Sequence, residues 1–464
     1  MTALDSLATA RIRRLTPEKR RALFRAVEAA EARVALFHRY RAGRRPVPHP
    51  IALTPFLVPR RAVPDLRRLA ALVHRLQAHA PRLWREDAGG FRALCPVSEA
   101  TARWLGRDAA RGPAPWQLMI RPDVGLEAGP GGALRPVLFE TNATGLAGLY
   151  NHAAGVRILR AEVFPRVYGA REARALADPP DLLALVVRWA AAAAAMLGRR
   201  RLQGVAFVED AGPLDGYSEV PRLVAAFREA GVRAVRGTAR ELSRTRGGVR
   251  LRDVAVDVVY RDVALEDLGM PERRGLEGFL DRFDAGAVLP GAGGEFGQKG
   301  LLECVERPEI ARRLFSPAER AFLRRTVPWT RVLGARRTED PAGRRVDLPE
   351  LARRARRGLL IKPNVGSSGA GILLGREAGP ARWEAGIARA LREPGRWVVQ
   401  ARRPGTRRPM LYLRGGRAYA GPCYFSLGLF YAPGDLGLHC RVSRDPVVNV
   451  ARRGAVACAF LVDR

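Results

Sequence analysis

Apolar residues recur at helical spacing through the first part of the chain. The pattern is clearest in RALFRAVEAAEARVALFHRYR (21–41) and DLRRLAALVHRLQAHAPRLW (65–84), where apolar side chains fall three or four positions apart. Between them, PVPHP (46–50) places prolines at alternate positions, and proline does not allow a helix to continue. We therefore expect a helical, structural region over 1–110 that is interrupted at these prolines.

After residue 110 the pattern changes to a hairpin followed by helices. The apolar runs WQLMIRPDV (116–124) and RPVLFETNATG (135–145) flank a GPGG turn, which predicts two antiparallel strands. An Ala-rich run from Leu182 to Leu197 is interrupted by Arg188 and is shorter than the roughly 20 residues of a membrane span. We expect it to be a packed helix of a soluble protein, within a part that covers 111–199.

The remaining chain mixes strands and helices, so the expected fold class is α/β. Over 200–290, strand patterns such as VAFVED and VRAVRG alternate with the helical pattern EVPRLVAAFREAG, which predicts a parallel, Rossmann-like unit. Over 291–464 we expect strands in GLLIKPN and GILLG around a Gly/Ser loop, a strand in WVVQARR, and a hairpin turning at Gly415-Gly416.

The charge of the chain admits two interpretations. Its 80 basic and 46 acidic residues leave a formal charge of +34. Such a balance is compatible with nucleic acid as a partner, because basic side chains neutralise phosphates. Arginine is scattered from end to end, however, with only three lysines and no basic tail or basic patch interleaved with aromatic residues. We therefore favour a general excess of arginine at exposed positions, which attracts anionic small molecules.

Cysteine and histidine give little support to a disulfide framework or a zinc site. The five cysteines form no CxxC pair, which is typical of reduced thiols in a cytoplasmic protein. The six histidines show no HxxxH or HExxH spacing. The N-terminal segment MTALDSLATARIRR lacks the apolar core of a signal peptide.

A glycine-rich loop after an apolar strand is the first candidate for phosphate binding. Lys362 ends the strand LLIKP, and the residues that follow it include Gly366, Ser367, Ser368, Gly369 and Gly371. Such a loop lets backbone N–H groups approach phosphate oxygens, and lysine adds a compact positive charge. The pattern is not a P-loop, in which lysine follows the glycines. A plain glycine-rich hairpin explains the same residues, so the loop alone leaves both interpretations open.

The predicted hairpin carries a second constellation. Glu140 and Asn142 lie two apart on one strand and therefore share a face, which Asp123 on the preceding strand reaches if the register permits. Carboxylate and amide oxygens are the hard ligands that Mg²⁺ prefers. Arg121 would share that face and could meet a phosphate. The alternative is a pair of surface carboxylates near a turn.

Three further polar residues stand out less strongly. Lys299 lies in the Gly-rich segment GGEFGQKG, Gln400 ends the strand WVVQ, and Arg441 lies near the C-terminal edge. By default these are an exposed lysine, a polar strand end and a surface arginine.

Taken together, these segments resemble the ATP-grasp superfamily. IKPNVGSSGAGILLG is similar to its phosphate-covering hairpin, WVVQARRPG to its adenine hinge, and RPDV with LFETN to its metal-binding region. In most members the metal ligands follow the lysine-bearing strands, whereas here they precede them. That order resembles the circularly permuted branch, which includes glutathionylspermidine synthetase, and it covers roughly residues 117–450.

The resemblance implies a role for each matched residue. Asp123, Glu140 and Asn142 would hold Mg²⁺; Lys299, Lys362 and the 366–371 loop would bind the ATP phosphates; the backbone at Val399 and Gln400 would meet adenine; Arg121 and Arg441 would steady the transferred phosphoryl group. The implied activity is an ADP-forming carboxylate–amine ligase that acts through an acyl phosphate on small or peptide-like substrates. A phosphotransferase of the same fold is the alternative within the superfamily.

One departure concerns the substrate. After Asn142 the chain reads ATGLAGLYN, where the synthetase pattern continues with acidic and proline residues. The N-terminal region also shows no amidase-like Cys/His arrangement. A polycationic substrate such as spermidine is therefore not expected for this basic protein.

Overall fold

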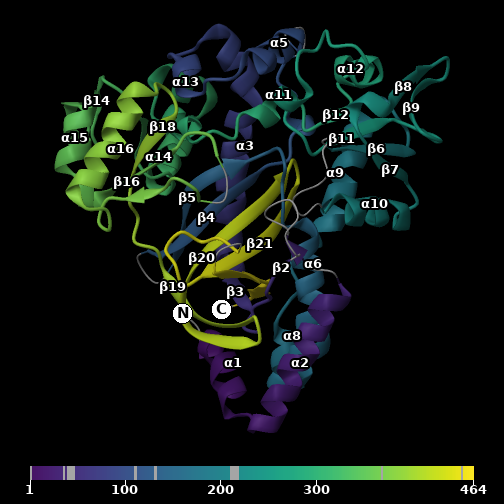
Figure 1. Cartoon of the computed structure of the whole chain (residues 1–464), viewed down its shortest axis with the longest axis vertical. Helices are drawn as coiled ribbons and strands as arrows, with labels where there is room; N and C mark the ends of the chain where they lie inside the picture. The colour runs from purple at the N-terminus through teal and green to yellow at the C-terminus, as the bar shows by residue number, and fades with distance from the viewer. Residues whose placement is uncertain are drawn as a thin grey trace.

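A central antiparallel sheet organises the molecule (Figure 1). The computed structural model describes residues 3–34, 37–38, 47–108, 112–129, 133–209, 219–366, 369–450 and 453–463. The sheet has six strands in the order β22-β21-β20-β4-β5, with β19 also paired to β20. Its strands are β4 (Arg121–Ala128), β5 (Leu134–Asn142), β19 (Arg407–Arg414), β20 (Arg417–Ala432), β21 (Asp435–Ser443) and β22 (Gly454–Ala457). The predicted β4–β5 and β19–β20 hairpins are both present.

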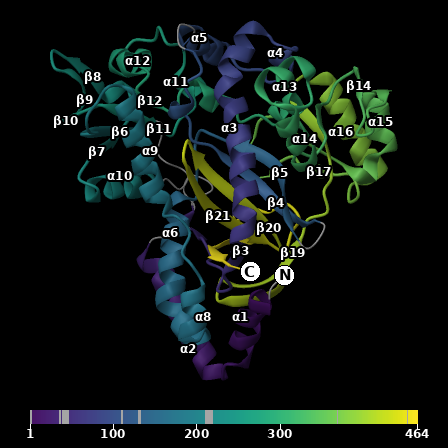
Figure 2. The ribbon, with the colours of Figure 1, turned by 180° about the vertical axis from the view of Figure 1, so that it is seen from behind.

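The long helix α3 covers the back of this sheet (Figure 2). Its residues Leu66, Leu69, Val73 and Leu76 recur at helical spacing and are buried in the main apolar core. The helices of this region are α1 (Ala3–Arg14), α2 (Pro17–Arg33), α3 (Val63–Glu86), α4 (Phe91–Leu94) and α5 (Glu99–Arg107), with a 3-10 turn, η1 (Arg60–Ala62).

The expectation that the whole of 1–110 is helical needs correction. The region also contains β1 (Phe37–His38), β2 (Val47–Pro48) and β3 (Phe56–Pro59). The last of these pairs in parallel with β23 (Ala459–Val462), close to the other end of the chain. The sequence around β3 gives no local sign of this pairing, because the partner strand lies about four hundred residues away.

Helices connect the central sheet to a smaller parallel sheet. They are α6 (Leu149–Ile158), the π-helical segment η5 (Leu159–Val163), α7 (Phe164–Val167), α8 (Ala170–Ala175) and α9 (Leu182–Met196), whereas the 3-10 turn η3 (Pro115–Gln117) precedes β4. Leu182, Leu185 and Trp189 bury one side of α9, as expected for a packed helix. Among the helices that the structure describes, none has both the length and the apolar character needed to cross a bilayer.

The unit at 200–290 contains the expected parallel sheet, in the order β12-β11-β6-β7. Its strands are β6 (Gly204–Val208), β7 (Arg233–Gly237), β11 (Val258–Arg261) and β12 (Val288–Leu289). A small antiparallel sheet follows β7, with β8 (Leu242–Thr245), β9 (Gly248–Leu251) and β10 (Val254–Ala255). The remaining elements are α10 (Val220–Glu229), η6 (Ala239–Glu241), α11 (Leu265–Leu268) and α12 (Glu277–Asp284).

A third unit, green in Figure 1, holds a four-stranded sheet in the order β13-β18-β16-β17. Its strands are β13 (Thr330–Val332), β16 (Leu359–Pro363), β17 (Leu373–Leu374) and β18 (Trp397–Ala401), with a separate ribbon of β14 (Arg337–Glu339) and β15 (Arg345–Asp347). Its helices are η7 (Ala292–Glu295), η8 (Lys299–Val305), α13 (Pro308–Leu314), α14 (Pro317–Thr326), α15 (Leu348–Arg354), η9 (Arg356–Gly358) and α16 (Pro380–Arg392).

The expected range 291–464 does not form a single unit. Its first part builds this third unit, whereas β19 to β22 complete the central sheet with β4 and β5 from the expected range 111–199. The division differs because backbone pairing joins strands irrespective of their distance along the chain. As a result, the two candidate sites of the sequence, on β4–β5 and on β16, lie in neighbouring sheets.

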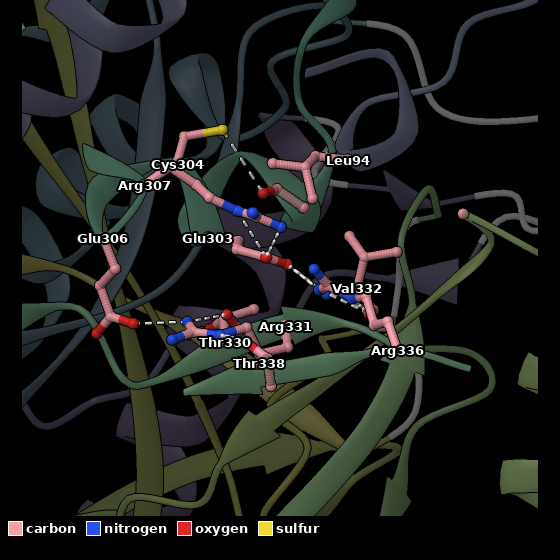
Figure 3. Close-up of polar contacts among 12 residues, drawn as sticks. Leu94, Glu303, Cys304, Glu306, Arg307, Thr330, Arg331, Val332, Arg336 and Thr338 are labelled. Carbon is pink, nitrogen blue, oxygen red and sulfur yellow. Dashed lines mark hydrogen bonds and ion pairs between the residues drawn. The ribbon is translucent and has the colours of Figure 1, made fainter. Parts of the chain in front are cut away.

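A buried carboxylate fastens η8 to β13 (Figure 3). Glu303 is 1% exposed and accepts hydrogen bonds from Arg307 Nη2 at 2.7 Å, Arg336 Nη2 at 2.6 Å and the Val332 N–H at 2.8 Å. A buried charge is tolerated only when it is paired in this way. The cluster therefore fixes the segment that begins with Lys299.

Candidate active site

The pairing of β4 with β5 gathers four polar side chains on one face. Its register places Arg121 opposite Asn142 and Asp123 opposite Glu140. Side chains directly opposite each other, and those two apart on a strand, share a face of the sheet. The register that the sequence left open is therefore the one that brings the candidate metal ligands together.

Asp123 is the centre of a buried charge cluster. Its side chain accepts hydrogen bonds from Arg441 Nη2 at 2.6 Å, Arg121 Nε at 3.2 Å and Asn142 Nδ2 at 3.3 Å. Burial opposes ionisation of Asp123, but the two guanidinium charges outweigh it and hold the pKa of this carboxyl below its usual value. Asp123 is thus an anion between two arginines that come from β4 and β21.

A glycine on the neighbouring strand makes room for this cluster. Gly428 of β20 lies opposite Asp123. A Cβ atom at Gly428 would lie 3.0 Å from Arg121 Cδ and 3.2 Å from Asp123 Oδ1, so that these side chains would have to shift. The close approach of β20 to the cluster therefore leaves little room for a side chain at this position.

Lys362 extends from β16 toward the end of β5. It is 4% exposed, and its Nζ donates to the Phe139 carbonyl at 2.7 Å and to Gln400 Oε1 at 2.9 Å. Burial lowers the pKa of Lys362 to about 7; the charge of Glu140 opposes this shift, and that of Lys299 adds to it. An anion that approaches Lys362 would therefore raise its pKa and favour the charged lysine.

Lys299 pairs with the Glu140 carboxylate. Its Nζ lies 3.3 Å from Glu140 Oε2 and donates to the Gly366 carbonyl at 3.0 Å. The fully buried Asn364 holds this arrangement together: its Oδ1 accepts from the Gly300 N–H at 2.6 Å, and its Nδ2 donates to two further carbonyls. Hydrogen bonds thus hold the start of the glycine-rich loop and the start of η8 together.

The glycine-rich loop uses backbone conformations that favour glycine. Gly366, Gly369 and Gly371 have φ angles of 142°, 67° and 75°. A Cβ at Gly369 would lie 2.4 Å from Val447 Cγ1, so the loop also packs closely on the segment after β21. Ser367 and Ser368, which the sequence assigned to phosphate binding, lie outside the described residues.

Asp123, Glu140, Lys362 and Arg441 line a cleft of about 1120 Å³, including its open mouth. Its charged and polar lining consists of Asp123, Glu140, Lys362, Gln400, Arg402, Arg403, Tyr424, Ser426 and Arg441. Its apolar lining includes Phe139, Leu360, Ile372, Leu374, Phe425 and Val447. We call this space the first cleft.

The backbone of Val399 and Gln400, which was expected to meet adenine, is engaged within a sheet. Both residues lie in β18, which is paired on one side with β13 and on the other with β16. Their backbone groups are therefore engaged in strand pairing. Val399 is also fully buried in an apolar cluster and does not line the cleft. The cleft is lined instead by the Gln400 side chain and by residues 401–403, where β18 ends.

The structure adds residues that the sequence did not single out. Thr330 Oγ1 accepts a hydrogen bond from Gln400 Nε2 at 2.8 Å and so orients the partner of Lys362. Arg402 and Arg403 bring two more cations to the first cleft. The arginines belong to the ARRPG segment and could have been noticed there, whereas no signal marks Thr330.

The donor set on the central sheet fits a magnesium ion. Asn142 uses its Nδ2 to donate to Asp123 and to the Arg121 carbonyl, which leaves its oxygen as the ligand atom. Within the described ranges, no three His, Cys, Asp or Glu side chains lie close enough to hold a metal ion. Two carboxylates with one amide oxygen nevertheless suit Mg²⁺, which usually keeps water and substrate phosphates as its other ligands.

The chain as a whole folds like a protein of known structure. It matches a glutathione synthetase-like effector from Globodera pallida, in its apo form, with a TM-score of 0.60 and 11% identity, over 95% of this chain and 97% of that chain. No protein-family model matches the sequence, and neither does any curated protein. At this level of identity the likeness establishes the fold, a mixed α/β arrangement of the glutathione synthetase-like type, in agreement with the resemblance found in the motifs.

Proposed function

We propose that this chain, which has a glutathione synthetase-like fold, is an ATP- and Mg²⁺-dependent ligase that joins a carboxylate to an amine. The observation that carries the proposal is that Lys362 lines the first cleft together with the carboxylates Asp123 and Glu140, and that Lys299 Nζ lies 3.3 Å from Glu140 Oε2. A metal–nucleotide complex needs both kinds of charge: anions for the cation, and cations for the phosphates.

The proposal includes a circularly permuted order of the ATP-grasp segments. The carboxylates on β4–β5 precede the lysines at 299 and 362 in the chain. The strands that follow the lysines, β20 and β21, return to the same sheet as β4 and β5 and supply Arg441. The tertiary arrangement is thus compatible with a site assembled in the permuted order.

The chain's own residues would bind and orient the reactants. Glu140, Asn142 and Asp123 would hold Mg²⁺, which when bound neutralises charge on the phosphate oxygens. Lys299 and Lys362 would bind the phosphates beneath the 366–371 loop. Arg441 and Arg121, already held on Asp123, would steady the phosphoryl group as it moves.

The proposed reaction consists of two nucleophilic displacements. A carboxylate oxygen of the substrate attacks the terminal phosphorus of ATP, and the bond to ADP breaks with its electron pair leaving on ADP. The amine nitrogen then attacks the acyl carbon, the bond from that carbon to the phosphate oxygen breaks, and phosphate leaves with the electron pair. The proton lost by the amine is taken up by phosphate or solvent.

Calorimetry with Mg²⁺ and ATP tests the proposal directly. We expect the wild type to bind ATP in the micromolar range, as is common for enzyme substrates, and only when Mg²⁺ is present. The Glu140→Gln/Asn142→Ala double variant should lose this Mg²⁺-dependent binding while it retains its fold, since neither side chain is fully buried. Asp123 is left in place because it neutralises two arginines. A well-folded wild type that binds no ATP would reject the proposal.

Proton uptake should accompany nucleotide binding. At pH 8 most of the Lys362 population is neutral, because the pKa of this group is lowered to about 7. Bound phosphates favour the charged lysine and raise its pKa, so each binding event should take up as much as one proton, and affinity should fall as pH rises above 7. Calorimetry in buffers of different ionisation enthalpy measures this uptake. An equal uptake by Lys362→Met would contradict the assignment.

A phosphotransferase remains the second candidate within this fold. Both enzymes release ADP, but only a ligase releases inorganic phosphate in proportion to the amide formed. Measuring ADP and phosphate together, with and without an amine, separates the two.

A further inference from the structure

A buried carboxylate holds the start of α6, the helix that follows β5 in the chain. Glu219 directly precedes α10 in the parallel-sheet unit and is 6% exposed. Its two oxygens accept hydrogen bonds at 2.5–3.1 Å from the backbone N–H groups of residues 148–151. Burial raises the pKa of Glu219, and these four donors oppose the shift because they stabilise the carboxylate anion. The first N–H groups of α6, which have no partner within the helix, are thus satisfied by a side chain from another unit.

A second contact joins α10 to the same part of α6. Arg222, in the first turn of α10, places its guanidinium carbon 5.0 Å from the centre of the Tyr150 ring. A guanidinium over an aromatic face is attracted by the negative charge of that face. Glu219 and Arg222 together therefore hold the parallel-sheet unit against the beginning of α6.

One peptide unit connects Glu219 with Arg121. The Gly148 N–H donates to Glu219, and the Ala147 carbonyl of the same peptide accepts a hydrogen bond from Arg121 Nη1. Because the peptide is planar and trans, its N–H and C=O point in opposite directions, and the direction of one fixes that of the other. The anion at the N–H and the cation at the C=O polarise the peptide in the same sense, so the two hydrogen bonds strengthen each other. Glu219 therefore determines where the Ala147 carbonyl points, and this carbonyl holds Arg121.

Glycine at position 148 permits this orientation of the peptide. Gly148 has a φ of 109°, a conformation that favours glycine. A Cβ atom at this position would lie 2.8 Å from His439 Nε2, so a larger residue would force a shift. Gly148 belongs to the ATGLAG segment (143–148), where the sequence departs from the glutathionylspermidine synthetase pattern. The departure thus coincides with the loop that contacts Arg121.

Arg121 in turn connects this peptide with Asp123. Its Nε and Nη2 lie 3.2 and 3.4 Å from the two Asp123 oxygens, beyond the distance of about 2.7–2.9 Å that is common for charged pairs. Asp123 alone therefore holds the guanidinium loosely, and the contact of Nη1 with Ala147 fixes its other end. Because Asp123 lines the first cleft as a candidate Mg²⁺ ligand, the placement of Arg121 influences the direction of the ligand oxygens.

We propose that Glu219 is a positioning residue, which orients Arg121 through the Ala147–Gly148 peptide and thereby holds the candidate Mg²⁺ ligand Asp123 in place. Glu219 is not among the described residues that line the first cleft, so it acts through its neighbours and not by contact with the nucleotide. Replacing groups that orient a metal ligand from outside changes metal affinity about 10–100-fold. Since Glu219 acts through two intermediate groups, we expect an effect near the lower end of this range. The inference rests on the Mg²⁺ site of the proposed ligase.

Glu219→Gln tests this role, because glutamine has nearly the same shape but carries no charge and has only one oxygen to accept the N–H groups. Calorimetry measures binding of the non-hydrolysable analogue β,γ-imido-ATP over a series of free Mg²⁺ concentrations. We expect the Mg²⁺ concentration for half-maximal binding to rise roughly tenfold, with wild-type binding restored at saturating Mg²⁺. A variant that was merely less stable would bind less nucleotide in total, at an unchanged Mg²⁺ midpoint. An unchanged midpoint in Glu219→Gln would therefore overturn the inference.

A double-mutant cycle shows whether the effect passes through Arg121. Arg121→Met should also raise the Mg²⁺ midpoint, and adding Glu219→Gln to it should raise the midpoint no further, since residues in one chain of contacts do not act additively. A further rise of similar size in the double variant would mean that Glu219 acts independently of Arg121, and would contradict the proposal.

Gly148→Ala provides a second route to the same peptide. It leaves Glu219 in place but forces the peptide to turn, because of the positive φ and the contact with His439. The Mg²⁺ midpoint should rise as in Glu219→Gln, which this variant replaces if the glutamine variant does not fold. A wild-type midpoint in Gly148→Ala would count against the role of the peptide and overturn the inference.

Asp181→Asn is the matched control. Asp181 is exposed, and its side chain accepts a hydrogen bond from the Leu183 N–H at 2.8 Å at the start of α9. Its replacement also removes a carboxylate from a helix N-terminus, but it should leave the Mg²⁺ midpoint unchanged. An equal shift would attribute the effect to the loss of any helix cap and contradict the proposal. A wild type that binds no β,γ-imido-ATP at any Mg²⁺ concentration would instead reject the ligase proposal.

Discussion

Replacing Lys362 with methionine is expected to lower Mg²⁺-dependent ADP release roughly 10²–10³-fold, the range found when one buried donor to a developing anion is removed. Methionine preserves most of the volume of the side chain but carries no charge and donates no hydrogen bond. In this molecule Lys362 lines the first cleft and donates to Phe139 and Gln400. Steady-state ADP release, measured beside ATP affinity, determines whether the loss is in binding or in turnover.

The chain offers a matched control for this experiment. Lys19 is one of only three lysines and lies exposed near the start of α2. Lys19→Met should leave both ATP affinity and turnover unchanged. Urea unfolding of the two variants tests the alternative that Lys362→Met merely unfolds the protein, because the carbonyl and amide oxygens it leaves unpaired cost about 1–3 kcal/mol each. Full turnover by a folded Lys362→Met variant would show that Lys362 is not part of the active site.

Asp123→Asn is expected to reduce the free energy of unfolding by about 3–5 kcal/mol and to abolish Mg²⁺-dependent ATP binding. The asparagine removes the one negative charge between Arg121 and Arg441, and Arg121 is buried almost as fully as Asp123. Uncompensated charges in such surroundings are far more costly than the loss of an exposed pair. Urea unfolding followed by circular dichroism measures the change.

Glu127→Gln on the same strand is the matched control for this prediction. Glu127 lies 3.4 Å from Arg135 and 3.9 Å from Arg403, and both of these arginines are about one-third exposed. Its loss should therefore cost less than about 1 kcal/mol. Similar losses of stability in the two variants would mean that the cluster around Asp123 has no special role in the fold.

The sequence identified the elements of the site because each has a local signature. Alternating apolar residues around GPGG and around Gly415-Gly416 predicted the two hairpins, and strand–helix alternation predicted the parallel sheet, as the structure shows. The glycine-rich segments and the predicted hairpin drew attention to Lys299, Lys362 and Asn142, whose side chains lie around the same carboxylates. These features depend on neighbours in the chain and are therefore visible in the sequence.

The segment expected to meet adenine shows what local patterns cannot reveal. A strand that ends in WVVQ is visible in the sequence, but whether its backbone remains available depends on how many strands pair with it. Here β13 and β16 pair with both edges of β18, and of the two residues only Gln400 lines the first cleft. No pattern within β18 reveals these partners.

The sequence by itself determined which helices and strands form and the chemistry of the polar residues that they carry. Only the tertiary structure decided that β20 and β21 return to β4, that β3 pairs with β23, and that Arg441 lies 2.6 Å from Asp123. The physical reason is that side-chain periodicity reflects local backbone geometry, whereas strand pairing and buried charge pairs depend on contacts between residues hundreds of positions apart.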